Sequence, residues 1–336
     1  MTPLPPLPEC EGVPDLAALA DRYEPIVIRG LARDWPAVEA ARRSDAEAFD
    51  YMLGFDRGVP VDAFVGPAEI GGRFFYRPDM SGFNFERKKG RFGDVARFIR
   101  ELEGREGAPA AYVGAAPVAE VLPGFEAANR LALLDSGKAA PRIWIGNETV
   151  VSTHFDLSDN IAVAVAGRRR FTLFPPDQAP NLYVGPLDFT MAGQPASLVP
   201  VRDPDLAAFP LFAGALAQAR TAELEPGDAI YIPALWWHNV EALKPLNILV
   251  NYWWDDMPAE SGAAFEAMIH AVLAVAPLGA RRRQAWRGLF DHYVFRADER
   301  HPAEHLRPEH RGILGEPNPA LRERIRQFLL RGLGRR

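Results

Sequence analysis

A histidine and a carboxylate two residues apart are the first candidates for chemistry. The segment Thr149–Asn160 holds His154 and Asp156 and has the pattern of a strand that runs into a turn. Side chains at positions i and i+2 of a strand point to the same face, so we expect this imidazole and this carboxylate to be neighbours. His238, at the end of Trp236–His238, would complete a face of two histidines and one carboxylate. Such a face suits non-haem Fe(II), because it leaves coordination positions open for substrate and oxygen.

The composition is that of an ordinary globular protein. The 336 residues are 48% hydrophobic and 24% charged, which allows one large domain with appendages or two domains. The net charge of -6 gives no reason to expect nucleic-acid binding. One cysteine, Cys10, permits neither an intrachain disulfide nor a cysteine-based zinc site, and it favours a reducing compartment. The start has no secretory signal pattern and no apolar run reaches membrane-spanning length, so we expect a cytoplasmic protein without membrane contact.

Three short basic segments interrupt this balance. They are Arg87–Arg91, Arg168–Arg170 and Arg281–Arg283. We interpret each as a solvated turn or helix end, which is the commonest place for such a run.

Short strands punctuated by glycine and proline dominate the centre of the chain. The turns at Gly167 and Pro226–Asp228 separate apolar or alternating runs, a pattern typical of a barrel or jelly roll. Residues 175–225 form a long insertion rich in proline, alanine and glycine, and insertions of this length are usually functional or mobile. The predicted strands cover residues 142–149, 151–155, 161–166, 169–174, 229–232, 238–242 and 247–253.

The flanking regions have a different pattern. Residues 1–14 are rich in proline and extended, whereas three helices are predicted after Pro258, over 259–275, 281–290 and 318–333. Before the central strands we expect helices over 15–23, from 34, over 44–53 and over 92–102, and short strands over 25–29, 61–65, 73–76 and 110–113. This divides the chain into an N-terminal segment (1–20), a catalytic domain (21–257, core barrel about 142–254) and a C-terminal helical region (258–336).

Several more motifs follow one another in order around the predicted strands. They are Gly146-Asn147, Asn160, Phe174–Gln178, Pro226–Asp228, Tyr231–Pro233, Asn251 and Trp253. With the histidines and Asp156, this series resembles the cupin-like JmjC oxygenases, the cupin-8 group that includes the asparaginyl hydroxylase acting on hypoxia-inducible factor. The resemblance covers roughly residues 20–255 and is most specific over 142–177 and 226–254. It implies a mainly β fold with flanking helices, a double-stranded β-helix of the jelly-roll (cupin, JmjC-like) type, with a C-terminal helical extension.

The resemblance also implies a set of cofactors. Fe(II) would be held by His154, Asp156 and His238, and 2-oxoglutarate would be the co-substrate, converted with O2 to succinate and CO2. The prime substrate would be an unknown protein side chain or small molecule, which is hydroxylated. The protein would hold the metal and the substrate in place and exclude water.

The resemblance assigns the 2-oxoglutarate pocket as well. Arg169 stands where the family often has a lysine for the distal carboxylate, and an arginine is permanently charged and binds carboxylates bidentately. Tyr112 matches the second anchor, and Asn160 and Asn251 match positions that line the same pocket. Val151 departs from the family, which has a threonine there.

These residues also have plainer interpretations: His154 with Asp156 as a surface pair, His238 as a core histidine, and Arg169 as a solvated arginine. The missing threonine hydroxyl would have to come from Ser152, Thr153 or Thr172. Trp236 and Trp253 are interpreted as core packing. The alternative class of protein is a non-catalytic cupin that keeps its metal for binding or scaffolding. The complete ligand set, the cation at position 169 and Tyr112 favour the enzyme, and substrate specificity is expected to lie in residues 176–225 and 66–92.

The C-terminal helices predict a mode of assembly. Residues 259–275 carry apolar side chains three and four apart, which places them on one helical face. These helices either pack against the outside of the barrel or interlock with a second copy, as the resemblance to cupin-like hydroxylases suggests. Twofold dimers are the commonest oligomers, so we expect a homodimer through residues 259–333.

Overall fold

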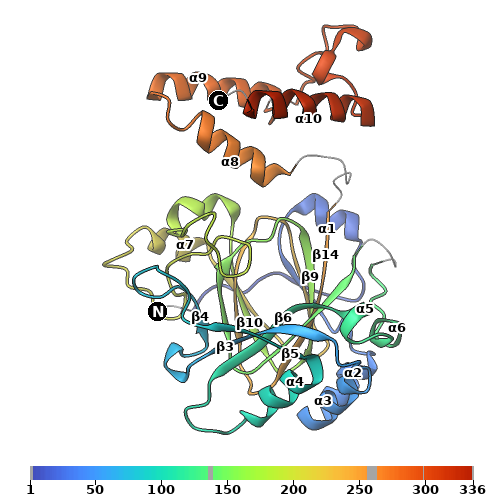
Figure 1. Cartoon of the computed structure of the whole chain (residues 1–336). Helices are drawn as coiled ribbons and strands as arrows, with labels where there is room; N and C mark the ends of the chain where they lie inside the picture. Colours follow the sequence, from blue (N-terminus) through green and yellow to red (C-terminus); the bar gives the residue numbers. More distant parts are fainter. Residues whose placement is uncertain (1–2, 135–138, 256–262, 298, 335–336) are drawn as a thin grey trace. The chain divides into compact units, whose positions relative to one another are not determined.

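The computed structural model describes residues 3–134, 139–255, 263–297 and 299–334. The chain divides into two compact units, residues 1–255 and 256–336. In the described part, every strand belongs to the first unit, and the second consists of helices and turns (Figure 1). The domain boundary that we predicted at 257–258 lies outside the described residues, as does the predicted start of the 259–275 helix.

Two sheets build the first unit. One has nine strands in the order β1-β2-β12-β9-β14-β7-β6-β3-β5, and the other has five in the order β11-β10-β13-β8-β4. Strands far apart in the chain are neighbours, which is the arrangement of a jelly roll, and the predicted mainly β fold is confirmed. The strands are β1 (Glu9–Glu11), β2 (Ile26–Arg29), β3 (Pro60–Gly66), β4 (Arg73–Phe74), β5 (Glu86–Arg91), β6 (Ala110–Pro117), β7 (Pro141–Gly146), β8 (Val150–His154), β9 (Asp159–Ala166), β10 (Arg169–Phe174), β11 (Arg220–Leu224), β12 (Ala229–Ile232), β13 (Trp237–Ala242) and β14 (Asn247–Trp254).

The alternation along β9 shows how the sequence makes room for a site. Ile161 and Val163 face an outer core that includes residues of the helices, whereas Ala162 and Ala164 belong to the inner core. Large side chains on the outer face attach the helices, and small ones on the inner face leave space inside the barrel. The helices of this unit are α1 (Leu16–Arg22), α2 (Pro36–Arg43), α3 (Asp45–Leu53), α4 (Phe92–Glu101), α5 (Val118–Val121), α6 (Phe125–Ala128) and α7 (Phe212–Gln218).

Two strands correct the sequence interpretation. The basic segment at Arg87–Arg91 is no turn or helix end but most of β5, which pairs with β3 at the edge of the larger sheet. Charged side chains are common on edge strands, where they discourage pairing with other chains. The insertion 175–225 likewise contains β11, which pairs with β10. β5 lacks the apolar alternation by which strands are recognised, because it lies at an exposed sheet edge. β11 does alternate, with Ala222 and Leu224 buried, but it is short and lies within the insertion.

The second unit carries much exposed apolar surface. Its helices are α8 (Ala264–Ala274), α9 (Ala280–Tyr293) and α10 (Pro319–Leu333), and no described residue of these three helices is buried. The exposed apolar side chains on them are Met268, Ile269, Val272, Leu273, Trp286, Leu289, Tyr293, Phe328, Leu329, Leu330 and Leu333.

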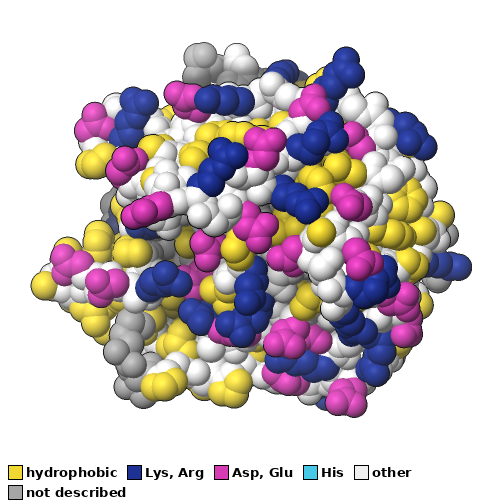
Figure 2. Space-filling model, turned by 90° about the horizontal axis from the view of Figure 1, so that it is seen from below, with side chains coloured by type: hydrophobic (Ala, Val, Ile, Leu, Met, Phe, Trp, Pro, Cys, Tyr) yellow, Lys and Arg dark blue, Asp and Glu magenta, His cyan; other side chains and the backbone are white. Residues whose placement is uncertain are grey.

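Two surface properties complete the description. Lys and Arg side chains are interspersed with Asp and Glu on the face in Figure 2. Among the described residues, no helix is long and apolar enough to cross a membrane.

Candidate metal and co-substrate site

Strand register brings the two histidines together. β8 and β13 are antiparallel neighbours, and His154 lies directly opposite His238 in this pair. Their rings have centroids 4.3 Å apart. A shift of either strand by one residue would turn its histidine to the other face of the sheet, so the pairing itself makes the site.

Asp156 enters the site from the turn after β8. Its backbone carbonyl accepts a hydrogen bond of 2.8 Å from the amide of Leu235, in the turn that leads into β13. Leu235 has a φ of 65°, a left-handed conformation that is costly for a residue with a side chain. That turn is fixed further by Asp159, whose carboxylate accepts from the amide of Ala234 at 2.9 Å. The turn that carries Asp156 and the turn that leads to His238 are therefore hydrogen-bonded to each other.

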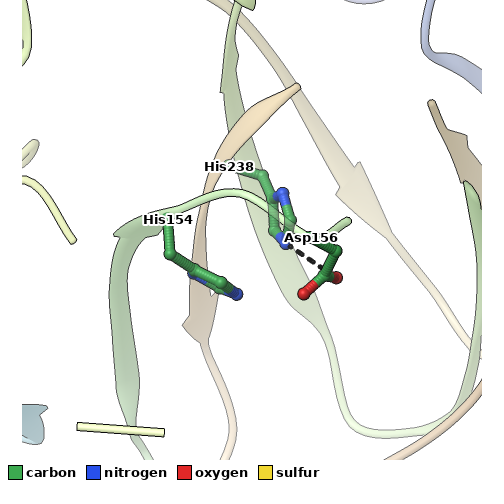
Figure 3. Close-up of side chains that lie close together, drawn as sticks. All are labelled: His154, Asp156 and His238. Atoms are coloured by element: carbon green, nitrogen blue, oxygen red, sulfur yellow. Dashed lines mark ion pairs between the residues drawn. The ribbon is translucent and has the colours of Figure 1, made fainter. Parts of the chain in front are cut away.

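The three side chains point toward one another (Figure 3). Their ligand atoms lie within 4.8 Å of one another, and Nε2 of His238 is 3.7 Å from Oδ2 of Asp156. Nδ1 of His154 contacts the Ser152 carbonyl at 2.9 Å, and Nδ1 of His238 contacts the Trp236 carbonyl at 3.0 Å. A carbonyl only accepts, so each Nδ1 carries the proton and each Nε2 keeps its lone pair for a metal. The donor set therefore fits a divalent transition metal.

Burial of His238 favours the neutral imidazole, the form that binds a metal. Desolvation, helped by the neighbouring His154, lowers the pKa of His238 to about 4. The imidazole is therefore neutral near pH 7, which is the form that binds metals.

A chain of amides and indoles orients the carboxylate. Oδ2 of Asp156 accepts from Nε1 of Trp253 at 3.0 Å and from Nδ2 of Asn160 at 3.4 Å. Asn160 accepts in turn from Asn251 at 3.3 Å, and Asn251 accepts from Nε1 of Trp144 at 2.8 Å. Such partners behind a metal ligand fix its direction and tune its basicity.

One cavity of about 720 Å³ inside the barrel joins these residues. All seven residues that the sequence singled out line it, and they come from six different strands and one turn. They are Tyr112, His154, Asp156, Asn160, Arg169, His238 and Asn251.

Arg169 is the buried cation of this cavity. It is 6% exposed, and its Nε has no hydrogen-bond partner. Within the described residues no carboxylate forms an ion pair with it, whereas the flanking Arg168 and Arg170 both pair with Glu223 outside the cavity. Desolvation lowers the pKa of Arg169 to about 10, so the guanidinium is still charged at neutral pH. A buried charge without a partner indicates a site for an anion.

Tyr112 lies on β6 with its ring against Phe64 and Phe74, at centroid distances of 4.7 Å to each. Desolvation raises the pKa of its hydroxyl, which is therefore protonated and able to donate at neutral pH.

Of the three hydroxyls expected to replace the family threonine, Ser152 lines the cavity. It accepts a hydrogen bond of 3.3 Å from Nε of Arg73. Thr153 and Thr172 are buried and do not contribute to the described lining. Val151 itself lies on the cavity wall and adds an apolar contact.

Sequence reasoning missed the role of Trp253. The structure places this indole on the cavity wall with its N–H on Asp156, so the interpretation as core packing is wrong. Trp253 lies two residues after Asn251 in β14, and this spacing on one strand face was the available signal. Trp236, by contrast, donates to the carbonyl of Tyr23 and does not line the described cavity.

Fold and site together define a JmjC-like cupin. A family model described as "Cupin-like domain" matches residues 16–260, and the chain belongs to this family.

Three curated relatives show the range within it. The chain is 38% identical over 111 residues to tRNA wybutosine-synthesizing protein 5 of Danio rerio, which is 32% of this chain and 30% of that protein. It is 34% identical over 112 residues to Lysine-specific demethylase JMJ31 of Arabidopsis thaliana, covering 33% and 20%. It is 35% identical over 113 residues to HSPB1-associated protein 1 of Homo sapiens, covering 33% and 22%. The matches span less than a third of each relative, and the three names favour no single substrate.

Proposed function

We propose that this protein is an Fe(II)- and 2-oxoglutarate-dependent oxygenase, a hydroxylase of a protein side chain or a small molecule. One observation carries the proposal. A buried arginine without a carboxylate partner lies in the same cavity as a complete two-histidine, one-carboxylate cluster. A metal-binding module would need the cluster alone, whereas a dicarboxylate that bridges metal and cation explains both.

The positions of the two features along the strands support this reading. Arg169 on β10 is paired with Ala242 on β13, four residues beyond His238. Four residues of a strand span about 13 Å. The long arginine side chain covers part of this distance and a five-carbon dicarboxylate covers the rest. The distal carboxylate would accept from the Arg169 guanidinium, whose fork matches it.

The polar groups between these ends have fitting roles. Tyr112 lines the same cavity, and its protonated hydroxyl would donate to the same carboxylate. Asn160 and Asn251 are hydrogen-bonded to each other, and Asn160 donates to Asp156. His154, Asp156 and His238 would hold the metal, with both imidazoles fixed through Nδ1. When bound, Fe(II) with 2-oxoglutarate supplies the O2-dependent oxidation that yields succinate and CO2. The residues of this chain position the co-substrate and keep it away from bulk water.

Succinate formation tests the proposal. We expect protein loaded with Fe(II) to convert 2-oxoglutarate to succinate in air, even without prime substrate, and the His154→Ala variant to form none. Protein that binds metal and 2-oxoglutarate but forms no succinate, with or without added candidate substrates, would instead be the binding or scaffold module.

A further inference from the structure

Three side chains form a stacked row across neighbouring strands at the cavity. Arg87 on β5 is paired with Phe64 on β3, and Phe64 is paired with Tyr112 on β6. The rings of Phe64 and Tyr112 are stacked, with centroids 4.7 Å apart and planes 7° apart. The guanidinium carbon of Arg87 lies 5.0 Å from the centroid of Phe64. The row therefore runs from the predicted co-substrate anchor Tyr112 out to an exposed cation.

Arg87 also contacts a loop that lines the cavity. We define the cavity loop as residues 185–196. Its base is closed by the amide of Gly185, which donates to the carbonyl of Ala196 at 2.9 Å. Its tip lines the cavity at residues 191–194, and Nη2 of Arg87 donates to the carbonyl of Met191. Arg87 is thus held at the rim, between the aromatic row and the loop.

Arg87 has no role in the proposed binding of metal and co-substrate. The charged side chains other than histidine in the described lining are Arg87, Arg169 and Asp156. Asp156 is assigned to the metal and Arg169 to the co-substrate. No carboxylate in the described residues forms an ion pair with Arg87, and its Nε and Nη1 have no hydrogen-bond partner there. Arg87 is therefore a second cation on the cavity wall, and none of the described carboxylates pairs with it.

We propose that Arg87 determines specificity by binding an anionic group of the prime substrate, while Phe64 and Phe74 contact an adjoining apolar part. The proposal rests on the proposed function, since it takes Arg169 as the co-substrate anchor. The substrate class is then an acid with an apolar portion next to its carboxylate, or a residue of that kind in a protein. The contact with the Phe64 ring and the hydrogen bond to the Met191 carbonyl hold the guanidinium at the cavity before a substrate binds.

A matched pair of probes tests this without turnover. Phenylacetate and phenylacetamide have the same shape and differ in charge. Their binding to the full chain is measured by ligand-observed NMR with Zn(II) and saturating 2-oxoglutarate present, so that Arg169 is occupied. We expect phenylacetate to bind about fivefold more tightly, the size of a partly exposed ion pair. Arg87→Gln should remove this preference, and Arg87→Lys should retain most of it.

The controls separate this proposal from the proposed function. Lys88→Gln, the next side chain on the same strand, should leave the preference unchanged. Equal binding of both probes to the unmodified protein, or a preference that persists in Arg87→Gln, would overturn the proposal. If Arg169→Gln removed the preference for phenylacetate while Arg87→Gln kept it, the probe would bind Arg169, and the proposal would be wrong. None of these results depends on whether the protein forms succinate.

Discussion

The indole N–H of Trp253 donates a 3.0 Å hydrogen bond to Oδ2 of Asp156. The two residues are 97 positions apart in the chain. The same oxygen accepts from Asn160, so one carboxylate oxygen has two donors before any metal is bound. The direction of this carboxylate is therefore set by side chains of β9 and β14 as well as by the turn that carries Asp156.

This relationship predicts the effect of losing the indole N–H. Trp253→Phe keeps the aromatic ring and should weaken divalent metal binding about 10- to 100-fold, which is typical for partners behind a metal ligand. Anaerobic titration with Co(II) or Fe(II) measures it. Trp236→Phe is the matched control, because its indole donates to Tyr23 away from the cavity. Unchanged metal affinity in Trp253→Phe would mean that Asn160 alone orients Asp156.

The metal ligands themselves give a second prediction. Asp156→Ala or His238→Ala should abolish iron binding and turnover, because two remaining ligands hold a labile divalent ion poorly. His270→Ala, a change in the second unit, serves as the control. Metal content after anaerobic gel filtration is the measurement. Full iron occupancy in Asp156→Ala would show that the assignment of the three ligands is wrong.

Arg169→Met should raise the 2-oxoglutarate concentration needed for half-maximal succinate formation. Hydrogen bonds to charged groups contribute about 1.5–3 kcal/mol, which corresponds to roughly a 10- to 100-fold change. Metal binding should be unaffected. Arg168→Met and Arg170→Met are matched controls, since both side chains pair with Glu223. An unaltered requirement in Arg169→Met would move the anchor to another residue.

The same substitution makes a separate prediction about stability. Arg169 carries a buried charge with an unsatisfied Nε, and such a group destabilises the free protein by about 1–3 kcal/mol. Without 2-oxoglutarate, Arg169→Met should therefore unfold at the same or a higher denaturant concentration than the unmodified protein. With metal present, the same concentration of 2-oxoglutarate should stabilise the unmodified protein more than Arg169→Met. A clear loss of stability in the free variant would indicate a structural role for Arg169.

Much of the barrel was predictable from the sequence, because its central strands have apolar runs between glycine and proline turns. β10 and β12 have the predicted bounds, and β9, β13 and β14 differ by one or two residues at one end. The histidines and Asp156 were identifiable from their spacing. What could not be read is the cross-strand register, which sets Arg87 beside Phe64 and Trp253 beside Asp156. Edge strands such as β5 were missed, because their exposed charged residues carry no apolar pattern.

We propose that the C-terminal helices join two copies of the chain. Apolar side chains are exposed on all three helices α8, α9 and α10, and exposed apolar surface marks interaction sites when it is contiguous. Light scattering should give a mass near twice 37.1 kDa for the full chain. Phe328→Glu, at a side chain that is 67% exposed, should shift the mass toward one chain. Arg324→Glu on the same helix is the control, and a full-length monomer at micromolar concentration would contradict the dimer.

The proposed function requires one cavity to hold the metal and 2-oxoglutarate together. Anaerobic calorimetric titration of 2-oxoglutarate into the Fe(II)-loaded protein tests it most directly. We expect one molecule to bind per chain, and we expect this binding to be lost when the metal is removed and in the His154→Ala variant. Binding of equal strength with and without metal, or no binding to the Fe(II)-loaded protein, would contradict it.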